Sequence, residues 1–482
     1  MRSRGHPVPA RMGALSREQH MSTTMDMDVL CIGAGGGAYP AAFQLARAGR
    51  KVVMVDPKGV MSGNCLAEGC VPSKAVREAA LLWNRAHHFS RFGIQRAPAV
   101  DYAAVIAHKD AVQQRRYAQH ADELKAFGDR LELVTGVARF LDDRRVKVEG
   151  PNVDCEYRAK QVIIASGAEV TVPPIPGAEH CLTSRDIFAL NPALRSLPAS
   201  LLVVGGGYIG LETACFFRAF GVRVHVMEMT NQLLPGFDPR MAAELARLLD
   251  PEITVTLNAK VETIEKTPTG FKVWYAHEGR KEAAESDQVL MAVGRSPVIP
   301  EGSDRIGLAL ERRAIKADEA QRTNIPGIYA CGDVNNQAPL FHAALRQSLV
   351  AGANILAGRA VDYFDRGSVP FTIFTLPAAA YVGTTPSAAA RLGMTLIEGA
   401  ASLSEDSRAQ ILDELGGEVR LFFSPGSLRL IGGWAIGLDA ENLISEIGLA
   451  VARGLTARDL AEFPGQHPMA SEAIAKAARA LV

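Results

Sequence analysis

The sequence Val29-Leu-Cys-Ile-Gly-Ala-Gly-Gly-Gly-Ala38 is an apolar stretch that runs directly into a glycine-rich turn. A helical pattern follows over residues 40–48, and a second apolar stretch over residues 51–55 ends at Asp56. The order of strand, glycine turn, helix, strand and acid predicts a parallel βαβ unit that binds a dinucleotide.

Each position of this pattern has a physical role. Gly33 permits the tight turn, and Gly35 lets the backbone approach a pyrophosphate at the helix N-terminus. Ala38 stands where the pattern has its third glycine, a replacement that the pattern tolerates. Asp56 is expected to accept hydrogen bonds from ribose hydroxyls.

The pattern occurs a second time. Apolar strands over residues 201–204 and 222–227 flank a helical segment, and the second strand ends at Glu228. The glycines of this turn are Gly205, Gly207 and Gly210. Two such units predict two dinucleotides, the alternative being that one unit is empty. Met, Thr and Asn follow Glu228 in place of arginine, so an adenosine 2′-phosphate would meet a carboxylate without a cation, which favours NAD(H) over NADP(H).

Two cysteines lie close together in Cys65-Leu-Ala-Glu-Gly-Cys70-Val-Pro-Ser-Lys74, directly before a helical run over residues 75–83. The spacing allows a small disulfide ring, and a helix start with Lys74 nearby favours thiolate over thiol. A redox pair and a structural disulfide both fit this spacing. A metal site is disfavoured because no second Cys or His cluster lies nearby.

Composition limits the class of protein. The length of 482 residues predicts about two to four domains. Basic and acidic residues number 52 each, so charge gives no reason to expect nucleic acid or an anionic membrane as partner. The longest apolar runs are strand-sized, and we expect no membrane span. The other cysteines stand singly in apolar segments, as in reduced intracellular proteins, which predicts a cytoplasmic location.

We expect residues 1–25 to be a disordered N-terminal extension. They contain four arginines with proline and serine, and they lack the continuous apolar core of a secretory signal. An organelle-targeting role and a later true start at an internal methionine are open alternatives.

Two strand-like segments in the middle of the chain end in glycine. Residues 161–165 precede Gly167 and residues 288–293 precede Gly294, and either could be where the chain crosses between domains. A third short strand leads to Asp333, which could bind a polyol such as the ribitol of a flavin, although an N-cap is the commoner role for such an aspartate.

The pattern changes after residue 368. It indicates an antiparallel sheet with helices and no glycine fingerprint, which predicts a separate α+β domain. The expected strands are 369–375, 419–423 and 428–436, and the expected helices are 386–392 and 440–453.

The last motif is His467-Pro-Met-Ala-Ser-Glu472. Pro468 suits the first position of a helix and holds His467 extended before it. Glu472, one turn into that helix, could then orient the imidazole so that its other nitrogen acts as a general base. A surface or capping histidine is the alternative.

With these motifs in this order, the chain after residue 25 resembles the FAD-dependent pyridine nucleotide-disulfide oxidoreductases, and within them most closely the dihydrolipoamide dehydrogenases. The residues that carry the resemblance are 65–74, 205–212, 329–333, 374–377 and 467–472.

The resemblance implies a FAD-binding domain (residues 26–168 and 292–366), an NAD-binding domain (169–291) and a dimerisation domain (367–482). It further implies a homodimer in which His467 and Glu472 of one subunit complete the site of the other.

The resemblance also assigns roles to the site residues. Cys65 would be the exposed thiol that exchanges with the substrate disulfide, Cys70 the thiolate facing the flavin, and Lys74 and Glu212 a charged pair beside the flavin ring. The implied FAD contacts are Gly33, Gly35, Asp56, Lys74, Ala138, Gly167, Asp333 and His342; the implied NAD contacts are Gly205, Gly207, Gly210, Glu228 and Gly294.

Several positions depart from the family pattern near the substrate mouth. Ser62-Gly-Asn64 replaces the usual Gly-Gly-Thr before the first cysteine, and Met469 replaces a usual threonine. Glu68, between the cysteines, would raise the pKa of both thiols if it faced them. These departures bear on the lipoyl substrate more than on the flavin-disulfide chemistry.

The sequence therefore predicts a dihydrolipoamide dehydrogenase or a close relative, with FAD and NAD as cofactors and a 2-oxoacid dehydrogenase complex as an expected partner. The alternatives are a flavoprotein diaphorase or quinone reductase, another disulfide or mercuric reductase, and a non-enzymatic sensor. Glu228 disfavours glutathione reductase, and the lack of a C-terminal cysteine pair disfavours mercuric reductase.

Overall fold

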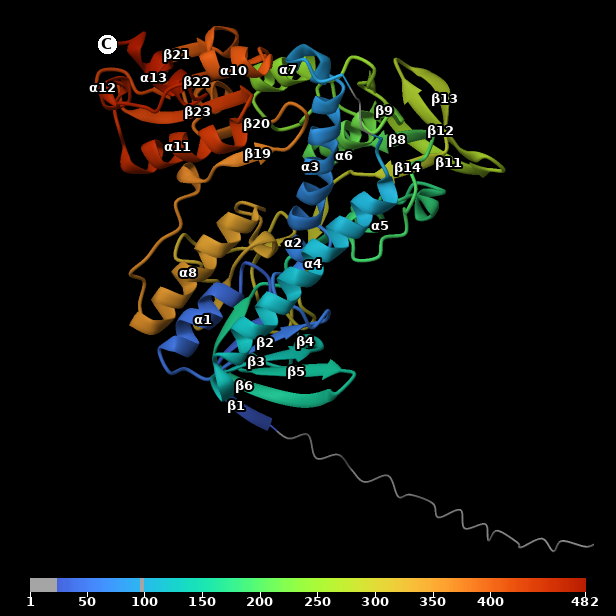
Figure 1. The fold of residues 1–482 in the computed structure, drawn as a ribbon. Helices are drawn as coiled ribbons and strands as arrows, with labels where there is room; N and C mark the ends of the chain where they lie inside the picture. The colour runs from blue at the N-terminus through green and yellow to red at the C-terminus, as the bar shows by residue number, and fades with distance from the viewer. Residues whose placement is uncertain (1–23, 96–98) are drawn as a thin grey trace, which may run out of the picture.

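The structure is a computed structural model that describes residues 24–95 and 99–482. It contains two units built on parallel sheets and a C-terminal unit built on an antiparallel sheet, which confirms the predicted fold class. In Figure 1 the first unit lies at the bottom, the second at the upper right and the C-terminal unit at the upper left. The prediction of disorder for residues 1–25 lies outside the described residues except at Thr24 and Met25, where it is wrong because both belong to the first strand.

The first sheet is built around the long strand β6. On one side β6 pairs with β1 along its length; on the other it pairs with β5 through its first half and with β18 through its second half. The parallel strands are β1 (Thr24–Ile32), β2 (Val52–Asp56), β3 (Leu131–Thr135), β6 (Val153–Ile164) and β18 (Ile328–Ala330), and the antiparallel ones are β4 (Val137–Phe140) and β5 (Arg145–Gly150).

The second unit has a parallel sheet covered by a three-stranded antiparallel sheet. The parallel strands, in spatial order, are β10 (Thr254–Thr256), β9 (Arg223–Met227), β8 (Ser200–Val204) and β14 (Gln288–Met291). The antiparallel strands are β11 (Lys260–Thr267), β12 (Gly270–His277) and β13 (Arg280–Ser286). Apolar residues of both sheets form one core, as their alternating burial requires.

The two predicted crossing points lie side by side. The strand β7 (Ala168–Val170), on the way into the second unit, pairs antiparallel with β15 (Arg295–Pro297), on the way out. Both crossing segments therefore form one two-stranded connection between the parallel sheets. A second small pair, β16 (Leu310–Glu311) with β17 (Ala314–Ile315), follows in the chain.

The C-terminal unit is a five-stranded antiparallel sheet with helices. Its strands, in spatial order, are β19 (Phe371–Ile373), β20 (Ala379–Gly383), β23 (Leu430–Gly437), β22 (Gly417–Phe423) and β21 (Ile397–Ser402). Its helices are α9 (Pro386–Arg391), α10 (Ser407–Leu412), α11 (Ala440–Arg453), α12 (Ala457–Glu462) and α13 (Glu472–Arg479). The predicted helices 386–392 and 440–453 are confirmed.

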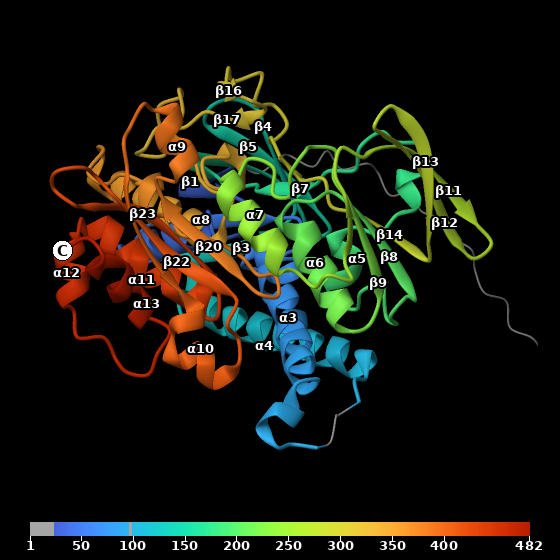
Figure 2. The ribbon, with the colours of Figure 1, turned by 90° about the horizontal axis from the view of Figure 1, so that it is seen from above.

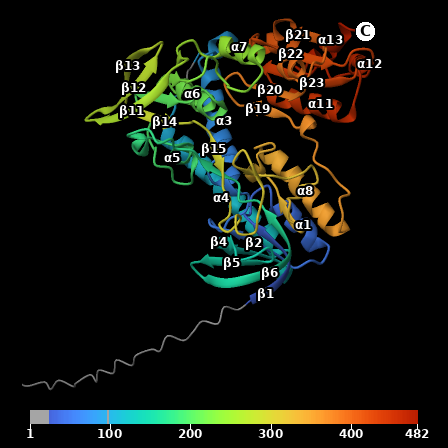
Figure 3. The same ribbon diagram turned by 180° about the vertical axis from the view of Figure 1, so that it is seen from behind.

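Two long helices join the three units. Figures 1, 2 and 3 show α3 (Cys70–Ala86) running between the second unit and the C-terminal unit, with α4 (Tyr102–Lys125) packed against it. One apolar cluster takes side chains from both helices, the second unit and the C-terminal sheet, which fixes the three units relative to each other. The remaining helices are α1 (Tyr39–Arg47), α2 (Gly63–Ala67), α5 (Ser184–Phe188), α6 (Tyr208–Ala219), α7 (Pro239–Leu248) and α8 (Phe341–Ala357).

Candidate active site

The two predicted glycine turns have the same construction. Gly33 and Gly205 have φ angles of +107° and +111°. A Cβ would lie 2.2 Å from the carbonyl oxygen of Ala165 in the first turn and 2.5 Å from that of Ala292 in the second. Only glycine fits both the conformation and the space. Each turn therefore lies directly against the end of the neighbouring strand, β6 or β14.

The next glycines leave the backbone open to a ligand. A Cβ at Gly35 would have only the Cα of Gly63, 3.8 Å away, within contact distance, and a Cβ at Gly207 would have no neighbour within 4 Å. Gly210 differs, because a Cβ there would lie 2.1 Å from the Gly205 carbonyl oxygen. The lack of a side chain at Gly210 therefore lets α6 pack closely on β8. Both turns thus fit a pyrophosphate at the helix N-terminus.

The acid at the end of each unit also holds its own glycine turn. Asp56 accepts a hydrogen bond from the backbone N–H of Ala34 (3.3 Å), and Glu228 accepts one from that of Gly206 (2.7 Å). Burial raises the pKa of Asp56 above its usual value. The sequence predicted only a cofactor-binding role for these carboxylates. Their hydrogen bonds to the glycine turns give them a structural role as well.

Three further predicted contact residues lie around the connection between the two units. Asp333 is the first residue of the 3₁₀ turn η4 (Asp333–Asn335); burial raises its pKa, and the charge of Arg295 opposes this rise. Neither Gly167 nor Gly294 would bring a Cβ within 4 Å of another atom. The surroundings of these residues are open enough for a ligand to approach the backbone.

Two other predicted FAD contacts already have partners within the protein. Ala138 is buried in β4, inside the apolar core of the first sheet. His342 lies in the first turn of α8, and a hydrogen bond of 2.7 Å joins its Nε2 to the carbonyl oxygen of Pro370. This bond links α8 to the segment that enters the C-terminal unit.

The two cysteines lie at the junction of α2 and α3. Cys65 is inside α2 and is partly buried, whereas Cys70 is the first residue of α3 and is exposed in the single chain. The implied roles of Cys65 as the exchanging thiol and Cys70 as the thiol facing the flavin stay predictions. Both sulfurs are free thiols in this structure. Within the described residues no cluster of three or more His, Cys, Asp or Glu could hold a metal ion.

The two thiols shift each other's pKa in opposite directions. A hydrogen bond donated by Cys65 lowers the pKa of Cys70 below its usual value, and the charge of Lys74 adds to this effect. The same hydrogen bond, together with burial, raises the pKa of Cys65. In the reduced pair Cys70 is therefore the thiol that loses its proton more readily.

Lys74 and Glu212 form the predicted charged pair. The Lys74 ammonium lies 2.8 Å from a carboxylate oxygen of Glu212, and the backbone N–H of Phe374 donates to the other oxygen at 3.0 Å. The ammonium also lies 4.2 Å from the centroid of the Phe374 ring. The pair joins α3, α6 and the C-terminal unit beside the thiols.

Glu68 pairs with cations, whereas the sequence left open that it faces the thiols and raises their pKa values. Its side chain is 3% exposed and accepts hydrogen bonds from Arg185 (2.8 Å) and Lys58 (3.2 Å), with Arg295 3.7 Å away. Burial raises the pKa of Glu68, but these cations outweigh burial and its net pKa is lowered. Glu68 is not among the largest influences on the pKa of either thiol.

The cations that surround Glu68 were not predicted from the sequence. A carboxylate between two cysteines, in a turn that must pack tightly, was the available signal, because a buried charge requires a partner. Arg185 comes from α5 and Arg295 from β15, so their pairing with Glu68 depends on how the second unit packs on the first. No local pattern identifies such partners.

The predicted histidine–glutamate pair is present. His467 Nδ1 lies 3.0 and 3.1 Å from the two carboxylate oxygens of Glu472. Because a carboxylate only accepts, Nδ1 carries the proton and Nε2 is free to accept another. The hydrogen bond from His467 lowers the pKa of Glu472.

The helix at this motif begins later than predicted. Glu472 is the first residue of α13, and Pro468 lies in the turn before it. The Glu472 carboxylate also accepts from the backbone N–H of Met469 (3.3 Å), so it holds the turn together. The carboxylate thus fixes the turn before α13 as well as the imidazole.

The two halves of the predicted site lie apart in the single chain. The His467 side chain is 69% exposed. Figure 1 shows α13 at the far side of the C-terminal unit, well separated from α2 and from the lower end of α3. Lys74 and Glu212 lie with the thiols, and His467 and Glu472 do not.

The arrangement defines a nucleotide-dependent oxidoreductase with a dithiol centre, and comparison with known proteins gives its family. Residues 27–348 match the pyridine nucleotide-disulphide oxidoreductases, and residues 369–478 match the dimerisation domain of the same family. The chain belongs to this family. It is accordingly an oxidoreductase that uses FAD and NAD, as the sequence predicted, and a homodimer fits its dimerisation domain.

Individual relatives narrow the comparison. The chain is 32% identical to dihydrolipoyl dehydrogenase of Bacillus subtilis over 95% of its length and 97% of the relative's. It is 34% identical to dihydrolipoyl dehydrogenase of Geobacillus stearothermophilus, over 94% and 96%. Among solved structures it is similar to LpdA of Mycobacterium tuberculosis (TM-score 0.86, 26% identity, covering 95% and 100%) and to the HOCl-induced flavoprotein disulfide reductase RclA of Escherichia coli (0.82, 25%, 94% and 100%).

Within residues 24–95 and 99–482 there is no helix with the length and apolar character that crossing a membrane requires.

Proposed function

We propose that this protein is a dihydrolipoyl dehydrogenase, which oxidises a lipoyl-type dithiol and passes its electrons through FAD to NAD⁺. The observation that carries the proposal is the position of the two thiols at the junction of α2 and α3, beside the Lys74–Glu212 pair, with Cys70 the thiol of lower pKa. One protonated thiol next to one thiolate is the reduced form of a pair that exchanges with a substrate disulfide.

The residues present fit the two cofactors. The first glycine turn with Asp56 would hold FAD, and the second with Glu228 would hold NAD. The chemistry that bound FAD supplies is two-electron transfer between the dithiol and a nicotinamide. Cys70 is influenced electrostatically by both Lys74 and Asp333, two of the proposed flavin contacts, so it is the thiol on the flavin side.

Thiol exchange at Cys65 follows from the two pKa shifts. Starting from the Cys65–Cys70 disulfide, a substrate thiolate forms a bond to the Cys65 sulfur, and Cys70 leaves as a thiolate because its pKa is the lower. The second substrate thiol, once deprotonated, attacks the first substrate sulfur and releases Cys65. The substrate has then lost two electrons and two protons; Cys65 takes up one of these protons as it leaves, and the base accepts the other.

We propose that the base is His467 of the partner subunit. Within one chain His467 is exposed and lies away from the thiols, and its Nε2 is free while Glu472 fixes Nδ1. An exposed, oriented base on the dimerisation domain suits a site that two subunits share.

The domain limits given by the resemblance, 26–168 with 292–366, 169–291 and 367–482, belong to the same proposal. So does assembly with a 2-oxoacid dehydrogenase complex, in which the relatives' named activity would recycle a bound lipoyl group. The singly placed free cysteines support a reducing, cytoplasmic location.

The test is oxidation of dihydrolipoamide by the purified FAD-loaded protein with NAD⁺ or NADP⁺. We expect turnover with NAD⁺, a preference of about tenfold or more over NADP⁺, and loss of turnover in Cys70→Ser. Turnover of another disulfide but not of lipoamide would show that the substrate is not a lipoyl group. The similarity to the disulfide reductase RclA is the reason to include other disulfides in the assay. Full dye reduction with no dithiol activity in the wild type would instead support a diaphorase.

A further inference from the structure

One helix holds the cysteine-bearing helix α2 at both ends. The Oγ of Ser62, the residue just before α2, is hydrogen-bonded to Nε2 of His120 on α4 (2.9 Å). At the other end, Nε2 of Gln113 on α4 donates to the carbonyl oxygens of Leu66 and Ala67 (2.9 and 3.0 Å). Cys65 lies between these two attachments.

The buried face of α4 is polar where it meets α2. Lys109, Gln113 and His120 are all buried on this helix, at spacings that place them on one side. A helix usually buries apolar side chains on such a face, so three buried polar groups require an explanation beyond packing.

Ser62 pays a conformational penalty for its contact. Its φ angle is +72°, a region that glycine adopts freely and other residues rarely do. Glycine is the usual residue of the family at this position, as noted above. Serine in its place gains a hydroxyl, and that hydroxyl bonds to His120. Strain of this kind at a reactive segment points to a functional contact.

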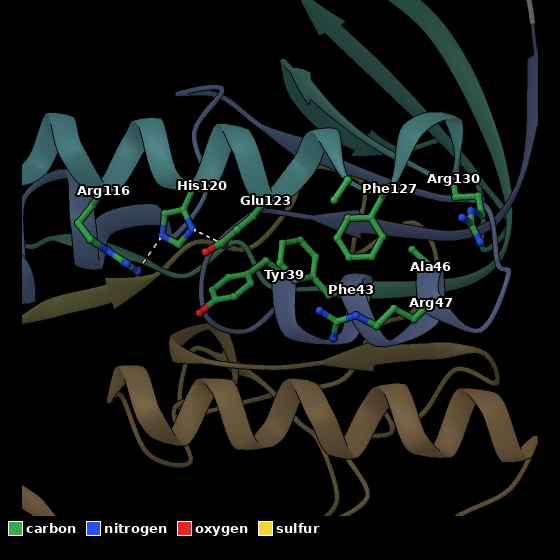
Figure 4. A pocket seen from close by; sticks show the side chains of 10 residues that line it. Tyr39, Phe43, Ala46, Arg47, Arg116, His120, Glu123, Phe127 and Arg130 are labelled. Atoms are coloured by element: carbon green, nitrogen blue, oxygen red, sulfur yellow. Dashed lines mark hydrogen bonds and ion pairs between the residues drawn. The ribbon is translucent and has the colours of Figure 1, made fainter.

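His120 is itself held in place. Its Nδ1 lies 2.9 Å from a carboxylate oxygen of Glu123, so Nδ1 carries a proton, and Nε2 is the ring nitrogen that bonds to the Ser62 hydroxyl. An Arg116 nitrogen also lies 3.3 Å from Nε2. Figure 4 shows Arg116, His120 and Glu123 along α4, facing Tyr39 of α1 across a hollow of about 730 Å³.

Lys109 extends the same network to the second unit. Its ammonium donates to the Gln113 side-chain oxygen (2.8 Å) and to the carbonyl oxygen of Ala189 at the end of α5 (2.6 Å). Its amino group is therefore the link between α5 and the glutamine that holds α2. Burial lowers the pKa of Lys109, and the hydrogen bond with Asp110 opposes this.

We propose that α4 acts as a clamp on the redox helix, with His120 and Gln113 as positioning residues for Cys65. His120 fixes the entry to α2 through Ser62, and Gln113 fixes its exit. Neither side chain is assigned contact with the substrate. The inference rests on the proposed function only in taking Cys65 as the reacting thiol.

Ser62→Gly is the mildest test, because glycine suits the φ angle and only the hydroxyl is lost. In the FAD-loaded, reduced protein we expect iodoacetamide to alkylate Cys65 about tenfold faster, since a loosened α2 exposes a thiol that is now partly buried. We expect turnover with dihydrolipoamide to fall about tenfold through misplacement of the sulfur, with an unchanged KM for NAD⁺. His120→Ala should do the same, and His120→Gln should recover part of the loss because glutamine can still bond to Ser62.

Two residues of the exposed face of α4 provide matched controls. Gln113→Leu should also speed the alkylation of Cys65 and slow turnover, because the bonds to the end of α2 are lost. His108→Ala and Gln114→Leu make the same changes as His120→Ala and Gln113→Leu on the solvent side of the same helix. Should Ser62→Gly and His120→Ala change both rates less than about twofold relative to these controls, the clamp is refuted and the network is only structural. If the wild-type cysteines form no disulfide, the proposed function fails, whereas the alkylation rate of Cys65 still decides for or against the clamp.

Discussion

The thiol half and the histidine half of the site are built in different ways. Around Cys65 and Cys70, three separate units of one chain converge, and a charged pair, a buried carboxylate and the contacts from α4 hold the segment. Around His467, a single exposed turn is held by one neighbouring carboxylate. The first half is complete within one chain, and the second is presented outward.

This difference has a functional consequence. A reactive thiol needs a set geometry and a set pKa, which a densely packed junction provides. A base that must reach into another subunit has to be exposed before assembly. On the proposed function, the single chain contains two half-sites that the dimerisation domain joins in trans.

Mixed dimers provide the sharpest way to break this comparison. Homodimers of Cys70→Ser should be inactive with dihydrolipoamide, and those of His467→Ala should be slower by about a hundredfold to ten-thousandfold. Refolding or coexpressing the two variants should restore about a quarter of the wild-type activity, averaged over all sites. Half of the randomly formed dimers are mixed, and one of the two sites in each mixed dimer is intact. Activity no higher than that of the parent homodimers would place the whole site within one subunit.

Removal of the Cys65 thiol tests the thiol half alone. In Cys65→Ala the hydrogen bond that most lowers the pKa of Cys70 is lost, so this pKa should rise toward 9.0, the ordinary value for a thiol. Desolvation, the next largest influence, raises the pKa of Cys70 and exceeds the lowering by the Lys74 charge, so the rise should not stop short of this value. The measurement is the pH dependence of Cys70 alkylation in the variant and in the reduced wild type, with Cys181→Ala as a control at a thiol outside the site. An unchanged profile would contradict the coupling of the two thiols.

The sequence predicted the parts of the molecule that local patterns encode. The two glycine turns, the strands before them and the acids after them were all found because the turn demands glycine and the strands are buried apolar runs. The His467–Glu472 pair was predicted for a similar reason, since both residues lie in one turn. The start of α13 at Glu472 was not predicted. The Glu472 carboxylate accepts a hydrogen bond from the backbone N–H of Met469 and so holds the preceding residues in a turn outside the helix.

The sequence could not predict partners that come from distant elements. Arg185 reaches Glu68 from α5, and Gln113 reaches the end of α2 from the middle of α4. The α4 contact has a faint signal, which is the presence of polar side chains at helical spacing on a buried face. Only the packing of the units on one another shows which polar groups those side chains satisfy.

Glu68→Gln should have the smallest effect on catalysis, and it separates stability from reactivity in the thiol half. Because Arg185 and Lys58 neutralise the carboxylate, we expect the alkylation rates of both thiols to change less than about threefold. We expect the free energy of unfolding to fall by about 2 kcal/mol at neutral pH, through loss of hydrogen bonds to a charged group.

The pH dependence of that stability difference follows from the lowered pKa of Glu68. A group whose pKa is lower in the folded state stabilises the fold at pH values above its unfolded pKa, near the ordinary 4.5, and loses this contribution as the pH falls through its folded value. Denaturant unfolding of wild type and Glu68→Gln should therefore differ most at neutral pH and converge as the pH falls from 4.5 through the lower folded pKa. A difference independent of pH would mean that the glutamate acts through shape and not charge, and a large change in thiol reactivity would mean that Glu68 does face the cysteines.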